Sequence, residues 1–269
     1  MIMAGTEMRE DAALFARLDD LAGRADRGEV TCTAFLTPRE VIVGRRYATA
    51  HGYGQRVVAW GGCEDAERAR LFFLPEYCEG LVEPSDWPEQ LCDAVEQTVV
   101  AIRIRGSGYR TLSHRDFMGS VLGLGIDRAA VGDIAAMDDR EAIVFCGEPV
   151  ATFLVESLEK VASDTVRVSR VAAGQTVSVP RRFAPISDTV ASPRLDCVVA
   201  ALANLSRERA QEAVRSGLCE VDYEAVEACD APLEPPCVLS VRGVGKFRLL
   251  SLSGPTKKGR LRLTAEKYI

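Results

Sequence analysis

Apolar residues recur at helical spacing at the start of the chain and at strand-like spacing after it. Leu14, Leu18 and Leu21 stand between charged residues, which predicts an amphipathic helix over residues 9–28. The next elements are expected to be a short helix with Thr37 as its cap and Pro38 in its first turn, strands over 57–60 and 71–74, and a helical turn over 65–70.

A second group of elements begins after a boundary near residues 84–90, where prolines and acidic residues gather. Its expected elements are a strand over 94–105, a helix over 113–125, a strand over 142–145, a helix over 149–160 and a strand over 165–171. Ser113 and Asp116 have the spacing of a capping box, and Gly125 is placed to end the helix in a left-handed conformation. The order β-α-β-α-β is typical of small α/β plaits, a type of domain that often binds RNA.

A third group follows a polar link that we expect over residues 185–192. One helix is predicted by the apolar face of Leu195, Val198, Val199 and Leu202. A second helix is predicted to begin after Ser206 as its cap and to end at Gly217. Short strands are expected around Val221, Val226, Val238–Val241, Leu249–Leu252 and Leu261–Leu263.

The composition agrees with a multi-domain α+β protein. Hydrophobic residues make up 47% of the 269 residues, which is enough for real cores, and the length suits two or three domains. The expected domains are 1–88, an N-terminal α/β region; 89–185, an α/β plait; and 192–269, two helices with a small sheet. The sequence shows neither an apolar run long enough to span a bilayer nor the pattern of a secretory signal, so we expect a cytoplasmic protein that does not bind membranes.

Charge is distributed unevenly along the chain. The formal net charge is -6, and residues 1–100 hold 10 Lys and Arg against 18 Asp and Glu. Residues 242–269 hold 8 basic residues against 1 acidic residue. A polyanion is therefore expected to bind near the basic end, and the acidic front could bind a protein partner.

The side chains that usually hold metals or perform catalysis are scattered. None of the nine cysteines forms a C-x-x-C pair, and the two histidines are far apart, so no metal site or cofactor is expected. His114-Arg115-Asp116 matches a kinase triplet, but no glycine-rich ATP loop accompanies it, and Gly243–Lys246 is too short for a phosphate loop. The sequence therefore predicts a protein that is not an enzyme.

Two segments near the C-terminus resemble the S4 RNA-binding domain. They are Arg194-Leu195-Asp196 and, after a spacing typical of that domain, Ser206–Leu218. Guanidinium groups and the free amides at a helix start both suit phosphate oxygens. The residues expected to contact RNA are Arg194, Ser206, Arg207, Arg209, Gln211 and Arg215 in the two helices, and Arg242, Lys246, Arg248, Lys257, Lys258, Arg260 and Arg262 in the basic end.

The whole chain resembles the YlmH-type S4 proteins of bacteria. The resemblance rests on Gly61–Tyr77, on His114–Ile126 with Gly132-Asp133-Ile134, and on Ser240–Lys246 with Gly254–Arg260. It implies an N-terminal α/β region, an RRM-like middle domain and an S4 domain. It also implies binding of rRNA and tRNA on the large ribosomal subunit, in rescue or quality control of stalled translation.

Two other functions stay open at this stage. One is a scaffold protein linked to cell division, whose acidic N-terminal region binds protein while RNA binding is secondary. The other is an RNA-modifying enzyme with an S4 tail, although residues 1–190 show no cofactor loop or nucleophile–base pair. Partners that survive nuclease treatment would favour the scaffold, and a base modification that depends on the protein would favour the enzyme.

Overall fold

The computed structural model describes residues 2–81, 87–172, 175, 177–179, 183–255 and 259–269. The chain divides into two compact units, unit 1 (Met1–Val179) and unit 2 (Pro180–Ile269). The described residues form seven α-helices and three sheets, so the expected mixed α+β class is confirmed. No helix in these ranges is long and apolar enough to cross a bilayer. The division into three domains stays a prediction.

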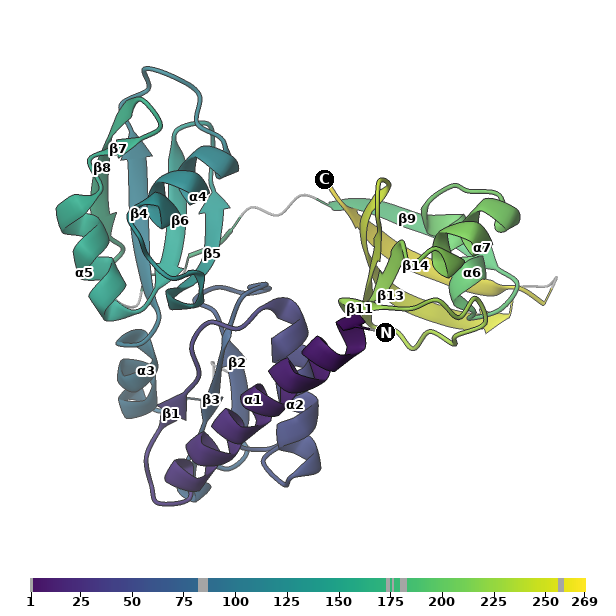
Figure 1. Ribbon diagram of the computed structural model, residues 1–269, viewed down its shortest axis with the longest axis horizontal. Helices are drawn as coiled ribbons and strands as arrows, with labels where there is room; N and C mark the ends of the chain where they lie inside the picture. The colour runs from purple at the N-terminus through teal and green to yellow at the C-terminus, as the bar shows by residue number, and fades with distance from the viewer. Residues whose placement is uncertain (1, 82–86, 173–174, 176, 180–182, 256–258) are drawn as a thin grey trace. The chain divides into compact units, whose positions relative to one another are not determined.

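The N-terminal part of unit 1 packs helices against a three-stranded antiparallel sheet (Figure 1). Its elements are α1 (Ile2–Ala25), β1 (Thr31–Cys32), α2 (Pro38–Ala50), β2 (Val57–Trp60), β3 (Arg70–Phe73), the 3₁₀ turn η1 (Glu76–Cys78) and α3 (Glu89–Glu96). The expected cap of α2 is confirmed, because the Thr37 side chain and the Glu40 carboxylate each accept a hydrogen bond from the other residue's backbone N–H. Leu14 and Leu18 of α1 are buried with Leu71 of β3.

The helical turn expected over residues 65–70 is wrong. This segment forms turns that lead into β3. The backbone N–H groups of Glu67 and Arg68 donate to the Asp133 carboxylate at 2.8 and 3.0 Å. A distant carboxylate thus fixes the backbone of this segment, and tertiary structure overrides the local helical preference.

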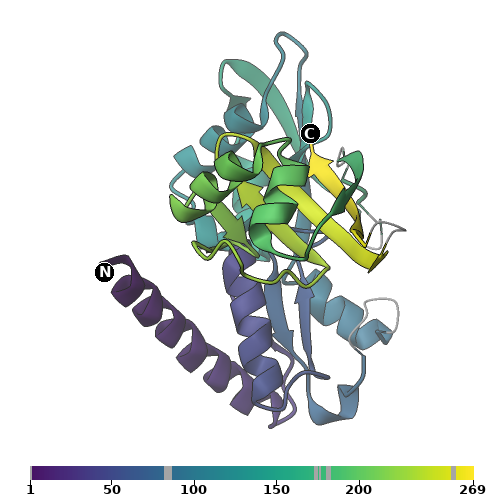
Figure 2. The same cartoon turned by 90° about the vertical axis from the view of Figure 1, so that its right-hand side faces the viewer.

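The middle part of unit 1 has the order β-α-β-β-α-β, followed along the chain by a last strand. Its elements are β4 (Val100–Gly106), α4 (His114–Gly123), the 3₁₀ turn η3 (Arg128–Ala130), β5 (Val131–Ala136), β6 (Glu141–Cys146), α5 (Glu148–Ser157), β7 (Lys160–Val161) and β8 (Asp164–Arg170). The sheet is antiparallel in the order β5-β6-β4-β8-β7. Phe117 of α4 and Leu154 of α5 are fully buried with Ile102 and Ile104 of β4, so both helices cover one face (Figures 1 and 2).

This part differs from the prediction in four places. Residues 94–96 end α3 instead of beginning a strand, α5 ends at Ser157, and the strands β5 and β7 were not expected. The capping box of Ser113 with Asp116 is confirmed, as is the left-handed conformation of Gly125 (φ +82°).

Close contacts join the two parts of unit 1. The half-buried Arg68 guanidinium donates to the carbonyl oxygens of Val131, Phe35 and Arg128 at 3.1, 3.0 and 3.0 Å. Gly62 lies so near Phe145 that a Cβ there would be 2.2 Å from the ring. These contacts explain why residues on both sides of the expected boundary near 84–90 form one compact unit.

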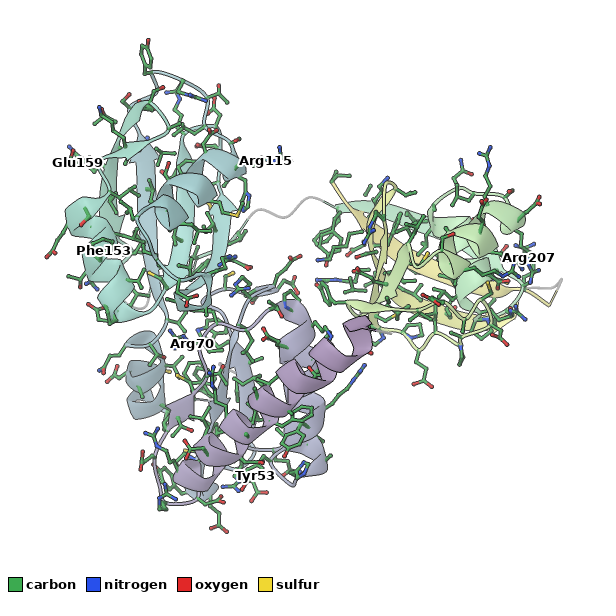
Figure 3. All side chains as sticks on the ribbon, viewed as in Figure 1. Tyr53, Arg70, Arg115, Phe153, Glu159 and Arg207 are labelled. Atoms are coloured by element: carbon green, nitrogen blue, oxygen red, sulfur yellow. The ribbon has the colours of Figure 1, made fainter. Side chains whose placement is uncertain are left out.

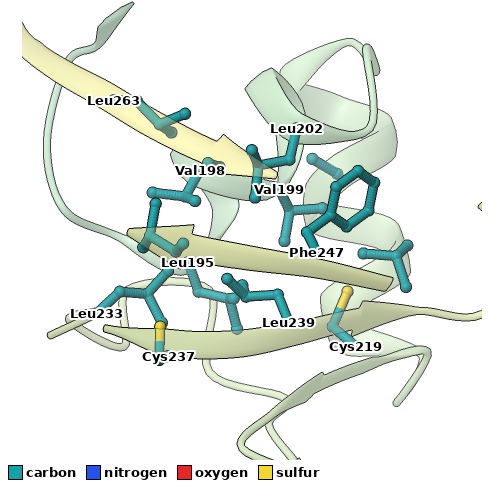
Figure 4. Close-up of a cluster of buried hydrophobic side chains, with 14 of the residues drawn as sticks. Leu195, Val198, Val199, Leu202, Cys219, Leu233, Cys237, Leu239, Phe247 and Leu263 are labelled. Carbon is teal, nitrogen blue, oxygen red and sulfur yellow. The ribbon is translucent and has the colours of Figure 1, made fainter. Parts of the chain in front are cut away.

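Unit 2 packs two helices on one face of a six-stranded antiparallel sheet (Figures 1 and 2). Its elements are β9 (Phe183–Val190), α6 (Leu195–Leu202), α7 (Arg207–Arg215), β10 (Cys219–Val221), β11 (Glu224–Ala225), β12 (Cys237–Val241), β13 (Gly245–Pro255) and β14 (Leu261–Tyr268), and the strand order is β11-β10-β12-β13-β14-β9. Leu195 and Val199 of α6 are buried against Phe247 of β13 and Leu263 of β14 (Figure 4). The predicted helix faces are therefore confirmed.

The polar link expected over residues 185–192 is wrong. Most of it belongs to β9, which pairs with β14 from Phe183↔Tyr268 to Val190↔Leu261. Pro185 lies in the edge strand of the sheet, where a missing backbone N–H is tolerated.

Candidate nucleic-acid interface

The two helices of unit 2 bring their N-terminal ends together. Arg194 directly precedes α6, and Ser206 caps α7 by accepting a hydrogen bond from the Arg209 backbone N–H at 3.3 Å. Arg207 is therefore the first residue of α7 (Figure 3). The helices pack through Ala210 and Val214 of α7, which are fully buried. Arg194 and Arg207, at the starts of the two helices, lie outside this buried contact.

A buried carboxylate stands between these arginines. Asp196, in the first turn of α6, is fully buried. It accepts hydrogen bonds from Gln211 Nε2 at 2.9 Å and from Arg194 Nε at 3.1 Å. The Arg207 guanidinium lies 3.6 Å from the same carboxylate. We call Arg194, Asp196, Arg207 and Gln211 the Asp196 cluster.

The Asp196 cluster holds its carboxylate ionised. Burial by itself would raise the pKa of Asp196, but the hydrogen bonds from Gln211 and Arg194 outweigh it and lower the pKa from 3.8 to about 2. An ionised Asp196 can orient both arginines at neutral pH. Their side chains nevertheless remain 40% exposed for Arg194 and 57% exposed for Arg207, so each retains donors that face solvent.

Arg207 also borders a pocket of about 270 Å³. The lining combines Arg207 with Arg260, which follows β13 in the chain, and with the small side chains of Ala200 and Ala201. Arg260 donates a hydrogen bond to the carbonyl oxygen of Thr189. The fold thus brings one residue of the basic end beside the helix pair.

Other predicted RNA contacts lie elsewhere in unit 2. Lys246 and Arg248 alternate along β13 with the buried Phe247, so they lie on the sheet face opposite the helices. Lys246 Nζ is 4.8 Å from the ring centre of Tyr223 and 4.9 Å from that of Tyr268. Arg209, Arg215, Arg242 and Arg262 are exposed, and Lys257 and Lys258 lie outside the described residues.

The structure adds one functional residue to those predicted. Asp196 was named only as part of the Arg-Leu-Asp triplet and not as a functional residue, whereas it is the shared partner of three predicted RNA contacts. The Arg-Leu-Asp triplet was a usable signal, because it places a carboxylate two residues after an arginine at a helix start. Among the described residues no group of three His, Cys, Asp or Glu side chains could hold a metal ion.

The chain is similar to proteins described as RNA-binding, ribosome-associated or linked to cell division. Residues 96–175 match a family model described as "Putative RNA-binding domain in YlmH". Over 238 residues the chain is 29% identical to the "Ribosome-associated protein quality control protein P2" of Bacillus subtilis (strain 168), which spans 87% of this chain and 86% of that protein. The solved structure of the cell division protein YlmH from Streptococcus pneumoniae has a TM-score of 0.46 and 18% identity, and the match covers 61% of this chain and 92% of that chain. The matched domain and the similarity along most of the chain together confirm the predicted resemblance to the YlmH-type family.

Proposed function

We propose that this protein is a cytoplasmic, non-catalytic RNA-binding protein that contacts rRNA and tRNA on the large ribosomal subunit. Its role would be rescue or quality control of stalled translation. In this proposal unit 2 acts as an S4 domain and residues 96–175 as an RRM-like domain. The observation that carries the proposal is the Asp196 cluster, in which one buried carboxylate presents two partly exposed arginines at adjacent helix starts.

The geometry of the cluster suits a phosphate backbone. Asp196 already restricts the guanidinium of each arginine on one side. The arginine therefore loses less conformational entropy when a phosphate binds its other side. The amides at the start of α7 add donors with partial positive charge. Folded RNA presents phosphates at regular spacing, so shape and not base sequence would decide where this surface binds.

The relatives supply the ribosomal context. The Bacillus subtilis protein is named as ribosome-associated and as a quality control protein, and it is similar along most of the present chain. The match to an RNA-binding domain model within unit 1 supports RNA as the ligand.

Sedimentation with purified bacterial ribosomal subunits tests the proposal. The wild-type protein should sediment with the large subunit at low salt and less so as salt rises, because phosphate contacts release counterions. Arg194→Gln/Arg207→Gln should abolish or strongly weaken this association. Arg17→Gln/Arg115→Gln is the matched control, because it also removes two exposed arginines, both from helices of unit 1.

Each outcome has a clear meaning. Loss of sedimentation in the first double variant alone assigns the interface to the Asp196 cluster. If the wild-type protein associates with neither subunit, with or without bound tRNA, the ribosomal proposal fails. Equal sedimentation of both variants would move the interface away from the two helices.

A further inference from the structure

The sheet of residues 100–170 has one face that its helices leave uncovered. Ile102 and Ile104 of β4 point toward α4 and α5, so Ala101, Arg103 and Arg105 point to the opposite face. Cross-strand pairing arranges this opposite face in three rows. The rows are Phe145–Ala101–Val171, Ala135–Ile143–Arg103–Ser169, and Glu141–Arg105–Arg167.

The first row is apolar and covered. Phe145 is fully buried, and Cys63 and Ala66 from the N-terminal part of unit 1 pack with it, as do Val177 and Val179. A Cβ at Gly62 would lie 2.2 Å from the Phe145 ring, so the segment around Gly62 packs closely against this row. Aromatic stacking of RNA bases on this row is therefore excluded, since no ring is accessible there.

The third row is open and basic. Arg105 is 72% exposed and Arg167 is also exposed, and the two residues are direct cross-strand partners on β4 and β8. Like charges that face each other across strands destabilise a sheet. Glu141, in the same row, has its carboxylate 3.1 Å from Arg103 and 3.9 Å from Arg105, so this one carboxylate is shared by two arginines.

Two neighbouring loops extend this basic row. Tyr109 is 83% exposed in the loop after β4. In the same loop, a Cβ on Gly108 would lie 3.1 Å from the Arg140 guanidinium, which belongs to the loop between β5 and β6. The Arg140 guanidinium is 60% exposed and lies 3.8 Å from the exposed carboxylate of Asp139, a weak surface ion pair, while the Asp138 carboxylate accepts backbone hydrogen bonds from Arg140 and Glu141.

We propose that Arg105 and Arg167, together with Arg140, form a second RNA contact that binds the phosphate backbone at the open end of this sheet. The proposal rests on RNA being the ligand, as in the proposed function, but it concerns unit 1 and not the Asp196 cluster. A phosphate placed between Arg105 and Arg167 relieves their mutual repulsion and gains two forked donors. The accessible Tyr109 ring offers a nearby surface on which an unpaired base can stack.

Fluorescence anisotropy with a fluorescein-labelled 20-nucleotide RNA hairpin tests this contact in the full-length protein. Affinity is measured across a series of salt concentrations for Arg105→Gln, Arg167→Gln and their combination. Each single change should reduce the slope of log affinity against log salt by about 0.7 to 0.9, and the pair by about twice that. Arg115→Gln is the matched control, because Arg115 is exposed on α4, which covers the other face of the sheet (Figure 3).

Thermal melting separates lost binding from lost folding. Because Arg105 and Arg167 repel each other, removing either charge should leave the melting temperature unchanged or raise it. A slope that falls without a fall in melting temperature supports the second contact.

The possible results also separate this contact from the Asp196 cluster. If Arg105→Gln and Arg167→Gln bind like Arg115→Gln while Arg207→Gln binds weakly, the second contact is overturned and the proposed function stands. If the first two weaken binding and Arg207→Gln does not, the second contact stands and the proposed role of the α6–α7 surface fails. A wild-type protein that binds neither the hairpin nor ribosomal subunits overturns both.

Discussion

Arg207 at the start of α7 places its guanidinium 3.6 Å from the carboxylate of Asp196 in the first turn of α6. This ion pair links the two helices. The Asp196 side chain is fully buried, whereas the Arg207 side chain is more than half exposed. The same arginine is thus part of the packing of unit 2 and of its proposed RNA surface. Substitutions at the two positions should separate these roles.

Replacing Asp196 with Asn should loosen the helix pair more than replacing Arg207 with Gln. Asn cannot supply the charge that both arginines need, whereas loss of Arg207 leaves the bonds from Arg194 and Gln211 in place. We expect a loss of about 1–3 kcal/mol for Asp196→Asn and below about 1 kcal/mol for Arg207→Gln.

Hydrogen exchange of peptides from α6 and α7 compares the stability of the helix pair in Asp196→Asn and Arg207→Gln directly. Tryptophan fluorescence would not, because both tryptophans, Trp60 and Trp87, lie in unit 1. Equal protection in Asp196→Asn and the wild type would contradict the proposed role of the carboxylate.

The stability of unit 2 should fall at acidic pH because of Asp196. The folded pKa of about 2 is below the ordinary value of 3.8, so the stabilisation is fully present above about pH 4 and is lost as pH falls toward 2. The expected loss is on the order of 1–2 kcal/mol, since the arginine partners are partly exposed. Urea unfolding followed by far-ultraviolet circular dichroism at pH 5 and pH 2.5 checks it, with Asp196→Asn as the reference. The difference between the two proteins should narrow at the lower pH, and a constant difference would refute the assignment.

Replacing Arg68 with Ala should destabilise unit 1. Its guanidinium donates to the carbonyl oxygens of Phe35, Arg128 and Val131. The Val131 carbonyl also accepts from the Arg128 side chain and the Arg128 carbonyl from the Val131 backbone N–H, so the cost falls mainly on the partly buried carbonyl of Phe35. We expect a loss of about 1–3 kcal/mol, measured by urea unfolding with tryptophan fluorescence. Arg45→Ala, at an exposed position on α2, is the control and should change stability by less than about 0.5 kcal/mol.

Gly62→Ala should be more damaging than Gly52→Ala. Both glycines have positive φ, +98° and +89°, so both substitutions carry the same backbone strain. Only at Gly62 would the new Cβ collide with Phe145, since nothing lies within 4 Å of a Cβ at Gly52. We expect about 1 kcal/mol for Gly52→Ala and at least about 2 kcal/mol more for Gly62→Ala, from the same fluorescence measurement. Similar losses of stability in the two variants would show that the segment around Gly62 can move away from Phe145 at little cost.

Local signals predicted the caps of several helices. Thr37 caps α2 as expected, the capping box of Ser113 with Asp116 forms, and Gly217 adopts φ +65° after α7. Each of these features depends on atoms within about four residues of one another, so the sequence alone contains the needed information.

Elements with distant partners were predicted poorly. Strand β9 was expected as a polar link because its sequence contains Pro185 and few apolar residues, and its partner β14 begins only at Leu261. Residues 65–70 have helix-forming side chains, but the Asp133 carboxylate binds two of their amides. Pairing between such distant segments follows from the packing of the whole unit, which local propensity does not report.

Some features of the candidate site also follow from local sequence signals, and others depend on contacts between distant segments. The amino-acid sequence by itself determined the two helices of unit 2, the arginines at their starts and the basic end, because helix periodicity, caps and charge are local properties. Only the tertiary structure decided that Asp196 joins Arg194, Arg207 and Gln211, and that Lys246 and Arg248 lie on the other side of the sheet. The reason is geometric: which side chains share a surface depends on how helices and strands pack, and burial then sets how strongly their charges interact.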